Sequence, residues 1–220
     1  KEAVLSLAAD EGVLRMYLDR PVSIPEAMAG DPFSLIRTAR ELLPLGGPLG
    51  ARPRDVVDRI RGLAPNWVPT SVSRKWVGAD RAGEVGVDGR GVLSAVVDTD
   101  ASPRYANHPQ LRGKAETYTV RGPAATDTNG HGGHVSMIAV GRRATSPIGL
   151  EVEGIAPGAN VLGVKALYTP IGSGMESDII RGMTVAVDRG ARVVNLSLGS
   201  QPMGTPADDA EAQAIHLMAD

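Results

Sequence analysis

The chain has 220 residues, of which 42% are hydrophobic, and a formal net charge of −2 at pH 7. This is enough apolar material for one sizeable core with a small appendage, and the balanced charge favours neither a nucleic-acid partner nor a solvated acidic tail. Cysteine is absent, which excludes disulfides and a thiolate nucleophile, and no uninterrupted apolar run approaches the ~20 residues of a membrane-spanning helix. We therefore expect neither nucleic acid nor membrane as a partner. Because both ends look cut, we expect a piece of a longer protein.

Residues 1–25 are predicted to form a small unit of their own. Residues 3–9 are typical of the end of a helix, and residues 13–18 alternate as a strand does. Pro21 and Pro25 are then expected to break regular structure.

Residues 26–75 are predicted to be a linker or an insertion ahead of the main domain, which we place at residues 76–220. A glycine-rich loop at residues 46–50 separates two short helix candidates, 34–43 and 53–62.

From Gly89 onward, strands are predicted to alternate with helices. Apolar runs of strand length lie at residues 91–97, 160–167 and 192–198, and helices are expected at residues 131–140, 176–189 and 206–219. Such alternation indicates parallel βαβ units, so the predicted fold class is α/β, a parallel β-sheet flanked by helices on both faces. The three strands are expected to be neighbours in one sheet.

Asp98 is a candidate functional residue because it directly follows a buried strand. Open α/β sheets place functional residues at the carboxyl ends of their strands, and an unpaired buried carboxylate is costly to desolvate. Taken alone, Asp98 has two interpretations of similar weight, a functional carboxylate and a structural turn or cap. A dinucleotide-binding interpretation is disfavoured because no glycine follows Val97 until Gly113.

His131 is the second candidate, since glycines on both sides let other groups approach its ring closely. We expect this ring to be exposed at the start of a helix. His134 lies one helical turn further, which invites a metal interpretation, but no glutamate lies between the two histidines and no cysteine exists. We therefore predict no metal site, and we expect His134 to be a core or helix-packing residue.

Several segments resemble motifs of the subtilase (subtilisin-like serine protease) family, in the family's order along the chain. Residues 96–99 with His108 and Pro109 resemble the aspartate motif, and residues 129–135 resemble the histidine motif. Further matches lie at residues 154–159, 177–182 and 193–199. Residues 1–25 resemble the C-terminal end of the family's inhibitory propeptide.

The resemblance implies a serine-type endopeptidase with an Asp-His-Ser triad. Asp98 would accept a hydrogen bond from His131, and His131 would act as general base and then general acid. Two backbone edges would bind a peptide or protein substrate as an added strand; their residues are Gly172, Ser173, Gly174, Ser197, Leu198 and Gly199. The resemblance also implies the chain's own propeptide as an intramolecular inhibitor, and a secreted or extracellular location.

The sequence departs from the family pattern in several places. The serine motif Gly-Thr-Ser-x-Ala and the strand with the oxyanion asparagine are absent, so we expect the chain to be truncated before them and inactive as it stands. The alternative is a pseudoprotease or binding domain that keeps the fold. Asp100 and Gly133 stand where the family usually has Gly and Thr. No cofactor is expected to be required, and we place no structural calcium, because residues 142–153 lack the family's asparagine pair.

Overall fold

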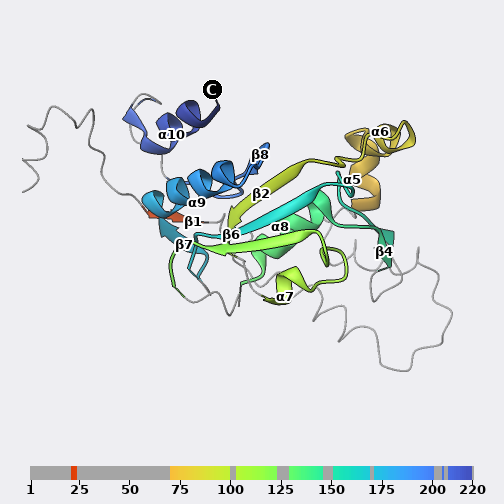
Figure 1. Ribbon diagram of the computed structural model, residues 1–220, viewed down its shortest axis with the longest axis horizontal. Coiled ribbons are helices and arrows are strands. Elements are labelled where there is room, and N and C mark those ends of the chain that lie inside the picture. The colour runs from red at the N-terminus through yellow and green to blue at the C-terminus, as the bar shows by residue number, and fades with distance from the viewer. Residues whose placement is uncertain are drawn as a thin grey trace, which may run out of the picture.

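The computed structural model describes residues 21–23, 70–99, 103–122, 129–145, 151–168, 171–200, 205 and 208–219 (Figure 1). The helices in these ranges are α5 (Thr70–Trp76), α6 (Ala79–Glu84), α7 (Pro103–Ala106), α8 (His131–Val140), α9 (Glu176–Asp188) and α10 (Ala210–Ala219). The strands are β1 (Pro21–Ser23), β2 (Leu93–Asp98), β3 (Ala115–Thr119), β4 (Ala144–Thr145), β5 (Glu151–Val152), β6 (Asn160–Lys165), β7 (Ser173–Met175) and β8 (Val193–Asn195). The elements expected within residues 3–18, 34–43 and 53–62 lie outside the described residues, and the proposed domain boundaries stay predictions.

A parallel four-stranded sheet in the order β3-β6-β2-β8 forms the centre of the molecule. Strand β2 pairs with β6 from Leu93 opposite Asn160 to Asp98 opposite Lys165, and it pairs with β8 on its other side. The expected parallel neighbourhood of the three apolar strands is therefore confirmed, and the fold class is α/β.

Alternate residues of β2 face two separate hydrophobic clusters, as the two-residue period of a strand requires. Ala95 and Val97 pack in one cluster with Ile179 and Met183 of α9. Val96 packs in the other cluster, which includes residues of α7 and α8. Helices α8 and α9 therefore cover opposite faces of the sheet, as the sequence predicted.

Helix α9 approaches the sheet closely because one of its inward positions is glycine. A Cβ atom on Gly182 would lie 2.8 Å from Val97 Cγ1 and 3.2 Å from Val164 Cγ1. Since these two valines belong to β2 and β6, the glycine lets the helix backbone lie directly on the centre of the sheet.

Two expected elements are shorter in the structure than in the sequence analysis. Strand β8 covers Val193–Asn195 of the expected 192–198, and α10 starts at Ala210 rather than at residue 206. The start of α10 has a local cause, since Asp209 Oδ1 accepts a hydrogen bond from Ala212 N (2.9 Å), as an N-cap residue does.

Strand β3 was missed by the sequence analysis. It is the outer strand on the β6 side of the sheet, and its sequence AETYT contains no apolar run. An edge strand needs fewer buried side chains than a central one, so hydrophobic patterning gave no signal for it.

Strand β1 contradicts the expectation that Pro21 breaks regular structure. Residues Pro21–Ser23 pair antiparallel with Ser173–Met175 of β7, in a two-stranded sheet separate from the central one. Proline can occupy the first residue of a strand, because its missing N–H there need not interrupt the hydrogen bonds between the two strands.

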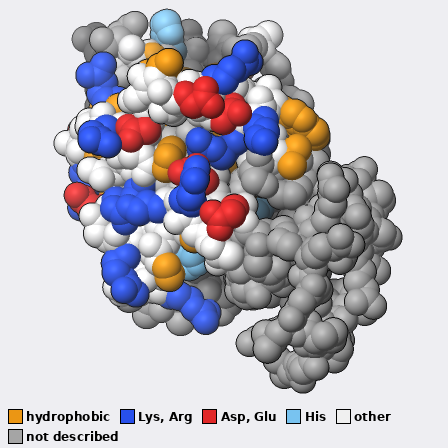
Figure 2. Space-filling model, turned by 90° about the vertical axis from the view of Figure 1, so that its right-hand side faces the viewer, with side chains coloured by type: hydrophobic (Ala, Val, Ile, Leu, Met, Phe, Trp, Pro, Cys, Tyr) orange, Lys and Arg blue, Asp and Glu red, His pale blue; other side chains and the backbone are white. Residues whose placement is uncertain are grey.

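Helix α5 is joined to the loop that follows β5 through one buried arginine. Arg74 donates hydrogen bonds to the backbone oxygens of Gly154 and Ile155 and forms an ion pair with Glu153 (3.5 Å). Figure 2 views this end of the molecule and shows basic side chains interleaved with acidic ones. Among the described residues, no helix combines the length and apolar character needed to cross a bilayer.

Candidate active site

The carboxylate of Asp98 lies at the carboxyl end of β2 and is 0% exposed. Its Oδ1 atom accepts a hydrogen bond from Thr99 N (2.7 Å). The backbone oxygen of Asp98 accepts from Ala166 N (2.9 Å) and Leu167 N (3.0 Å), which fixes the end of β2 against the segment after β6. The position agrees with the rule that functional groups gather where parallel strands end.

His131 is the first residue of α8, and the turn before it requires a glycine. Gly130 has φ 83°, a left-handed conformation that side chains disfavour. The His131 N–H donates to Asn129 Oδ1 (3.1 Å), and Gly132 N donates to Thr99 Oγ1 (3.0 Å). These contacts set the first turn of α8 beside the end of β2.

The structure brings Asp98 and His131 together, as expected. His131 Nδ1 lies 2.8 Å from Asp98 Oδ1 and 2.9 Å from Asp98 Oδ2. Since an ionised carboxylate can only accept, Nδ1 carries the proton it donates. In the neutral ring, Nε2 is then a hydrogen-bond acceptor, which is the tautomer that a general base needs.

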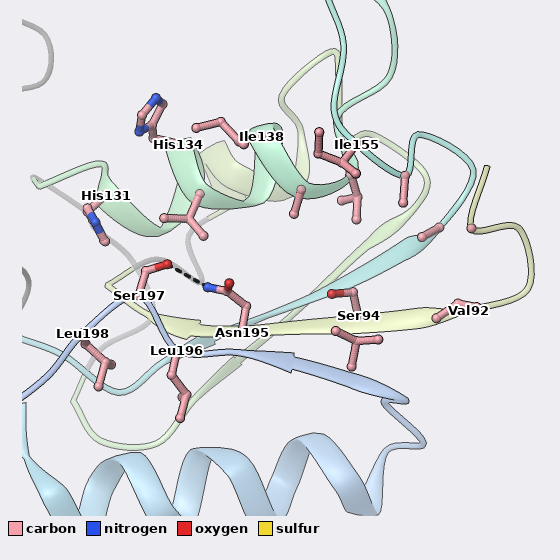
Figure 3. Close-up of a pocket in the computed structure, with 17 residues that line it drawn as sticks. Val92, Ser94, His131, His134, Ile138, Ile155, Asn195, Leu196, Ser197 and Leu198 are labelled. Atoms are coloured by element: carbon pink, nitrogen blue, oxygen red, sulfur yellow. Dashed lines mark hydrogen bonds between the residues drawn. The ribbon is translucent and has the colours of Figure 1, made fainter. Parts of the chain in front are cut away.

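The expected exposure of the two histidines was wrong in both cases. The His131 ring is 2% exposed because it packs against the buried Asp98 carboxylate, whereas His134 is exposed on the next turn. Figure 3 shows the His131 ring turned toward the segment that follows β8 and the His134 ring turned away from it. Desolvation and the neighbouring His131 ring lower the pKa of His134.

A groove of about 950 Å³ lies between α8 and the strands β2 and β8, and His131 is one of its lining residues (Figure 3). Most of the other lining side chains are apolar, among them Val135, Ile138 and Leu196. An apolar groove with a buried Asp-His pair at its edge is a typical arrangement for a reactive site.

Gly172, Ser173 and Gly174 form a strand edge that already pairs with another segment. Ser173 and Gly174 belong to β7, whose antiparallel partner is β1. Gly172 N donates to Tyr168 O (2.8 Å) and Tyr168 N to Ser173 O (2.7 Å), which closes the loop before β7. This edge therefore pairs with a strand of the same chain, and its role in substrate binding stays a prediction.

Ser197, Leu198 and Gly199 follow β8. Ser197 and Leu198 line the groove, and Ser197 Oγ accepts a hydrogen bond from Asn195 Nδ2 (2.9 Å). Leu198 packs against the same hydrophobic cluster as Leu167, and Gly199 is exposed. The role of these residues in substrate binding stays a prediction.

The sequence analysis missed Thr99 and Lys165 as supporting residues. Lys165 ends β6 opposite Asp98, is 7% exposed, and donates from Nζ to Thr99 O (3.0 Å). A lysine inside an apolar strand was the available signal, because a buried ammonium needs oxygen partners. Within the described ranges, no group of three or more His, Asp or Glu side chains is arranged to hold a metal ion.

Comparisons with known proteins point to one family. The model of the subtilase family matches residues 89–219. Subtilisin Savinase from Lederbergia lenta is 40% identical over 134 residues, which cover 60% of this chain and 46% of that protein. An alkaline protease from Alkalihalobacillus alcalophilus is also 40% identical, over 60% of this chain and 32% of its own length. Thermitase from Thermoactinomyces vulgaris is 34% identical over 59% of this chain and 43% of its own length.

These matches span less than half of each relative's length, so they concern one part of the protease fold. The matched region includes the parallel sheet, the Asp98–His131 pair and the groove beside it. The chain belongs to the subtilase family of serine proteases.

Proposed function

We propose that this chain carries the Asp and His of a subtilisin-type serine endopeptidase. The observation behind the proposal is the buried contact of the Asp98 carboxylate with His131 Nδ1, at 2.8 and 2.9 Å. In this role Asp98 holds the ring orientation and stabilises the imidazolium. His131 Nε2 takes the proton of a serine hydroxyl during attack on the substrate carbonyl and then gives it to the leaving amine.

The nucleophile of this proposal belongs to the family's serine motif, which the sequence does not contain. Ser136 is an unsuitable substitute because its hydroxyl is 0% exposed and donates to Gly132 O (2.8 Å). Ser197 lines the groove, but its hydroxyl accepts from Asn195. We therefore propose that the remaining part of the protease presents its serine to His131, and that the chain alone does not hydrolyse peptides.

Peptide substrates are proposed to bind as an added antiparallel strand on β7. The pairing of Val22 with Gly174 and of Ser23 with Ser173 supports this mode, because in this chain the β7 edge pairs antiparallel with another strand. Residues 21–23 would then occupy the place of substrate, which is how an intramolecular propeptide inhibits. This segment belongs to the part of the chain that resembles the family's propeptide.

The test compares the chain with a longer protein that continues it through a Gly-Thr-Ser-x-Ala motif. A serine-directed phosphonate should label the longer protein, which should cleave generic peptides, and His131→Ala should abolish labelling and turnover together. The chain by itself should remain unlabelled. Full activity of the His131→Ala protein would contradict the assignment.

A folded longer protein that binds peptides but resists the phosphonate would instead favour the alternative function, a strand-binding pseudoprotease. The β1–β7 pairing is compatible with that function as well, since it requires no chemistry. An extracellular location is proposed on the family resemblance.

A further inference from the structure

The first turn of α8 carries His131, yet its sequence gives it little rigidity. Gly130, Gly132 and Gly133 surround the histidine, and glycine restricts the backbone less than any other residue. Gly130, the N-cap of α8, has no side chain, and the His131 N–H is instead capped by Asn129 Oδ1 (3.1 Å). Side-chain contacts around Gly132 must therefore help to fix the orientation of this turn.

A buried hydrogen-bond chain reaches this turn from α7. Tyr105 OH donates to Ser136 Oγ (2.9 Å), and Ser136 Oγ donates to Gly132 O (2.8 Å). Tyr105 is 3% exposed and Ser136 is 0% exposed, so water does not compete for these bonds. A serine hydroxyl has one proton, and donation from Tyr105 to its lone pair leaves that proton for Gly132.

The opposite side of Gly132 is held by the end of β2. Gly132 N donates to Thr99 Oγ1 (3.0 Å), and Thr99 N donates to Asp98 Oδ1 (2.7 Å). Gly132 is thus bound through its N–H on the Asp98 side and through its carbonyl on the Tyr105 side. Any rotation of this residue moves the adjoining His131 relative to Asp98.

We propose that Tyr105 and Ser136 are positioning residues that hold Gly132 and so set the His131 ring against the Asp98 carboxylate. They offset the flexibility that glycine introduces at position 133, where the family usually has threonine. The consequence for catalysis rests on the proposed function, whereas the geometry is a property of this chain and can be measured without any hydrolysis.

The experiment measures the exchange of the His131 Nδ1 proton with water by NMR, in the 15N-labelled chain. Tyr105→Phe keeps the ring and removes the hydroxyl, and Ser136→Ala removes the next link. Each variant is expected to accelerate exchange roughly fivefold, the effect of one buried hydrogen bond. The double variant should be no faster than Ser136→Ala alone, because both residues act through one contact.

Tyr118→Phe is the matched control. Tyr118 lies in β3, where its ring packs under Arg189 (4.9 Å to the centroid), and the substitution should leave Nδ1 exchange unchanged. If Tyr105→Phe lowers thermal stability while Nδ1 exchange stays as in the unaltered chain, its role is structural and the proposal is overturned. If Tyr105→Phe fails to fold, Ser136→Ala decides by the same criterion.

The complete protease separates this proposal from the proposed function. Tyr105→Phe should lower kcat roughly fivefold and leave KM unchanged, since substrate binds elsewhere. Accelerated Nδ1 exchange in a protein without peptidase activity would refute the function and uphold the positioning role. Unchanged Nδ1 exchange in an active protease would refute the positioning role and uphold the proposed function.

Discussion

The C-terminal end of α8 and its N-terminal end are fixed by different kinds of group. At the C-terminal end, four carbonyls accept hydrogen bonds from one loop and one lysine: Gly154 N donates to Gly141 O (2.7 Å), Ile155 N to Ile138 O (2.9 Å), Ala156 N to Ala139 O (2.8 Å) and Lys114 Nζ to Val140 O (2.5 Å). These are the carbonyls that a helix leaves without an internal partner. Three of the four donors are backbone N–H groups.

At the N-terminal end, side-chain oxygens accept hydrogen bonds from the first N–H groups of the helix. The N–H of His131 donates to Asn129 Oδ1, and the N–H of Gly132 donates to Thr99 Oγ1. Both acceptors are short polar side chains next to the Asp98–His131 pair. The difference teaches that substitutions at the N-terminal end should alter the geometry of the candidate site, whereas those at the C-terminal end should mainly alter stability.

Asp98→Asn should give the largest effect at the N-terminal end. The amide keeps the size of the carboxylate but offers an N–H to Nδ1, which selects the wrong tautomer of His131. In the complete protease we expect kcat to fall about 10⁴-fold with little change in unfolding free energy. Asp188→Asn, on the exposed end of α9, is the control. Retained activity in Asp98→Asn would remove the distinction between the two ends.

Gly154→Ala should give the largest effect at the C-terminal end. A Cβ atom there would lie 2.8 Å from Met137 O and would also collide with the backbone of Gly141. Because backbone cannot yield easily, we expect urea unfolding of this chain to show a loss of about 3 kcal/mol. Gly199→Ala, where a Cβ meets open space, should change little. Equal stability of the two variants would contradict the packing argument.

Lys114→Ala should destabilise the chain by a smaller amount. Lys114 is 6% exposed, and its Nζ also donates to Pro157 O (2.6 Å), so its loss leaves two carbonyls short of a partner. We expect a loss of about 2 kcal/mol in the free energy of unfolding. Lys75→Ala, at an exposed position of α5, serves as control. An unchanged exchange rate of the His131 Nδ1 proton in Lys114→Ala would sharpen the separation between the two ends.

The pH dependence of stability should report Lys114 as well. Desolvation, with the Arg142 charge, lowers the Lys114 pKa from 10.5 to about 8, so between these values the folded chain binds fewer protons than the unfolded chain. The contribution of Lys114 to the free energy of unfolding therefore rises with pH between about 8 and 10.5, by about 1 kcal/mol per pH unit at most. Urea unfolding between pH 8 and 10 should show this slope, and Lys114→Ala should lack it. The same slope in both proteins would assign it to other groups.

Much of the central fold could be predicted because its signals are local. The apolar runs around Val96, Val164 and Val194 have strand length, and the spacing of Ile179 and Met183 is helical. Strand β3 lacked such a signal, since an edge strand can be built from polar residues. Strand β1 was obscured by Pro21, whose compatibility with pairing depends on the facing residues of β7.

The residues of the candidate site were found by their types and their order, but their surroundings were not. The histidine motif identified His131, yet the sequence assigned exposure to His131 and burial to His134, and the structure reverses both. Helical period alone says which residues share a face and does not say what covers that face. The Asp98 carboxylate, 33 positions away along the chain, covers His131.

The sequence by itself determined the α/β class and the parallel strands, because these follow from short-range periodicity. The pairing of Asp98 with His131 was expected only through the resemblance of their motifs to those of a known family. The tertiary structure alone decided which groups support that pair. Tyr105, Thr99 and Lys165 come from three separate elements, and their hydrogen bonds exist because packing brings donors and acceptors together in a region closed to water. Such contacts leave no local pattern, since each partner would be an ordinary polar residue if it faced solvent.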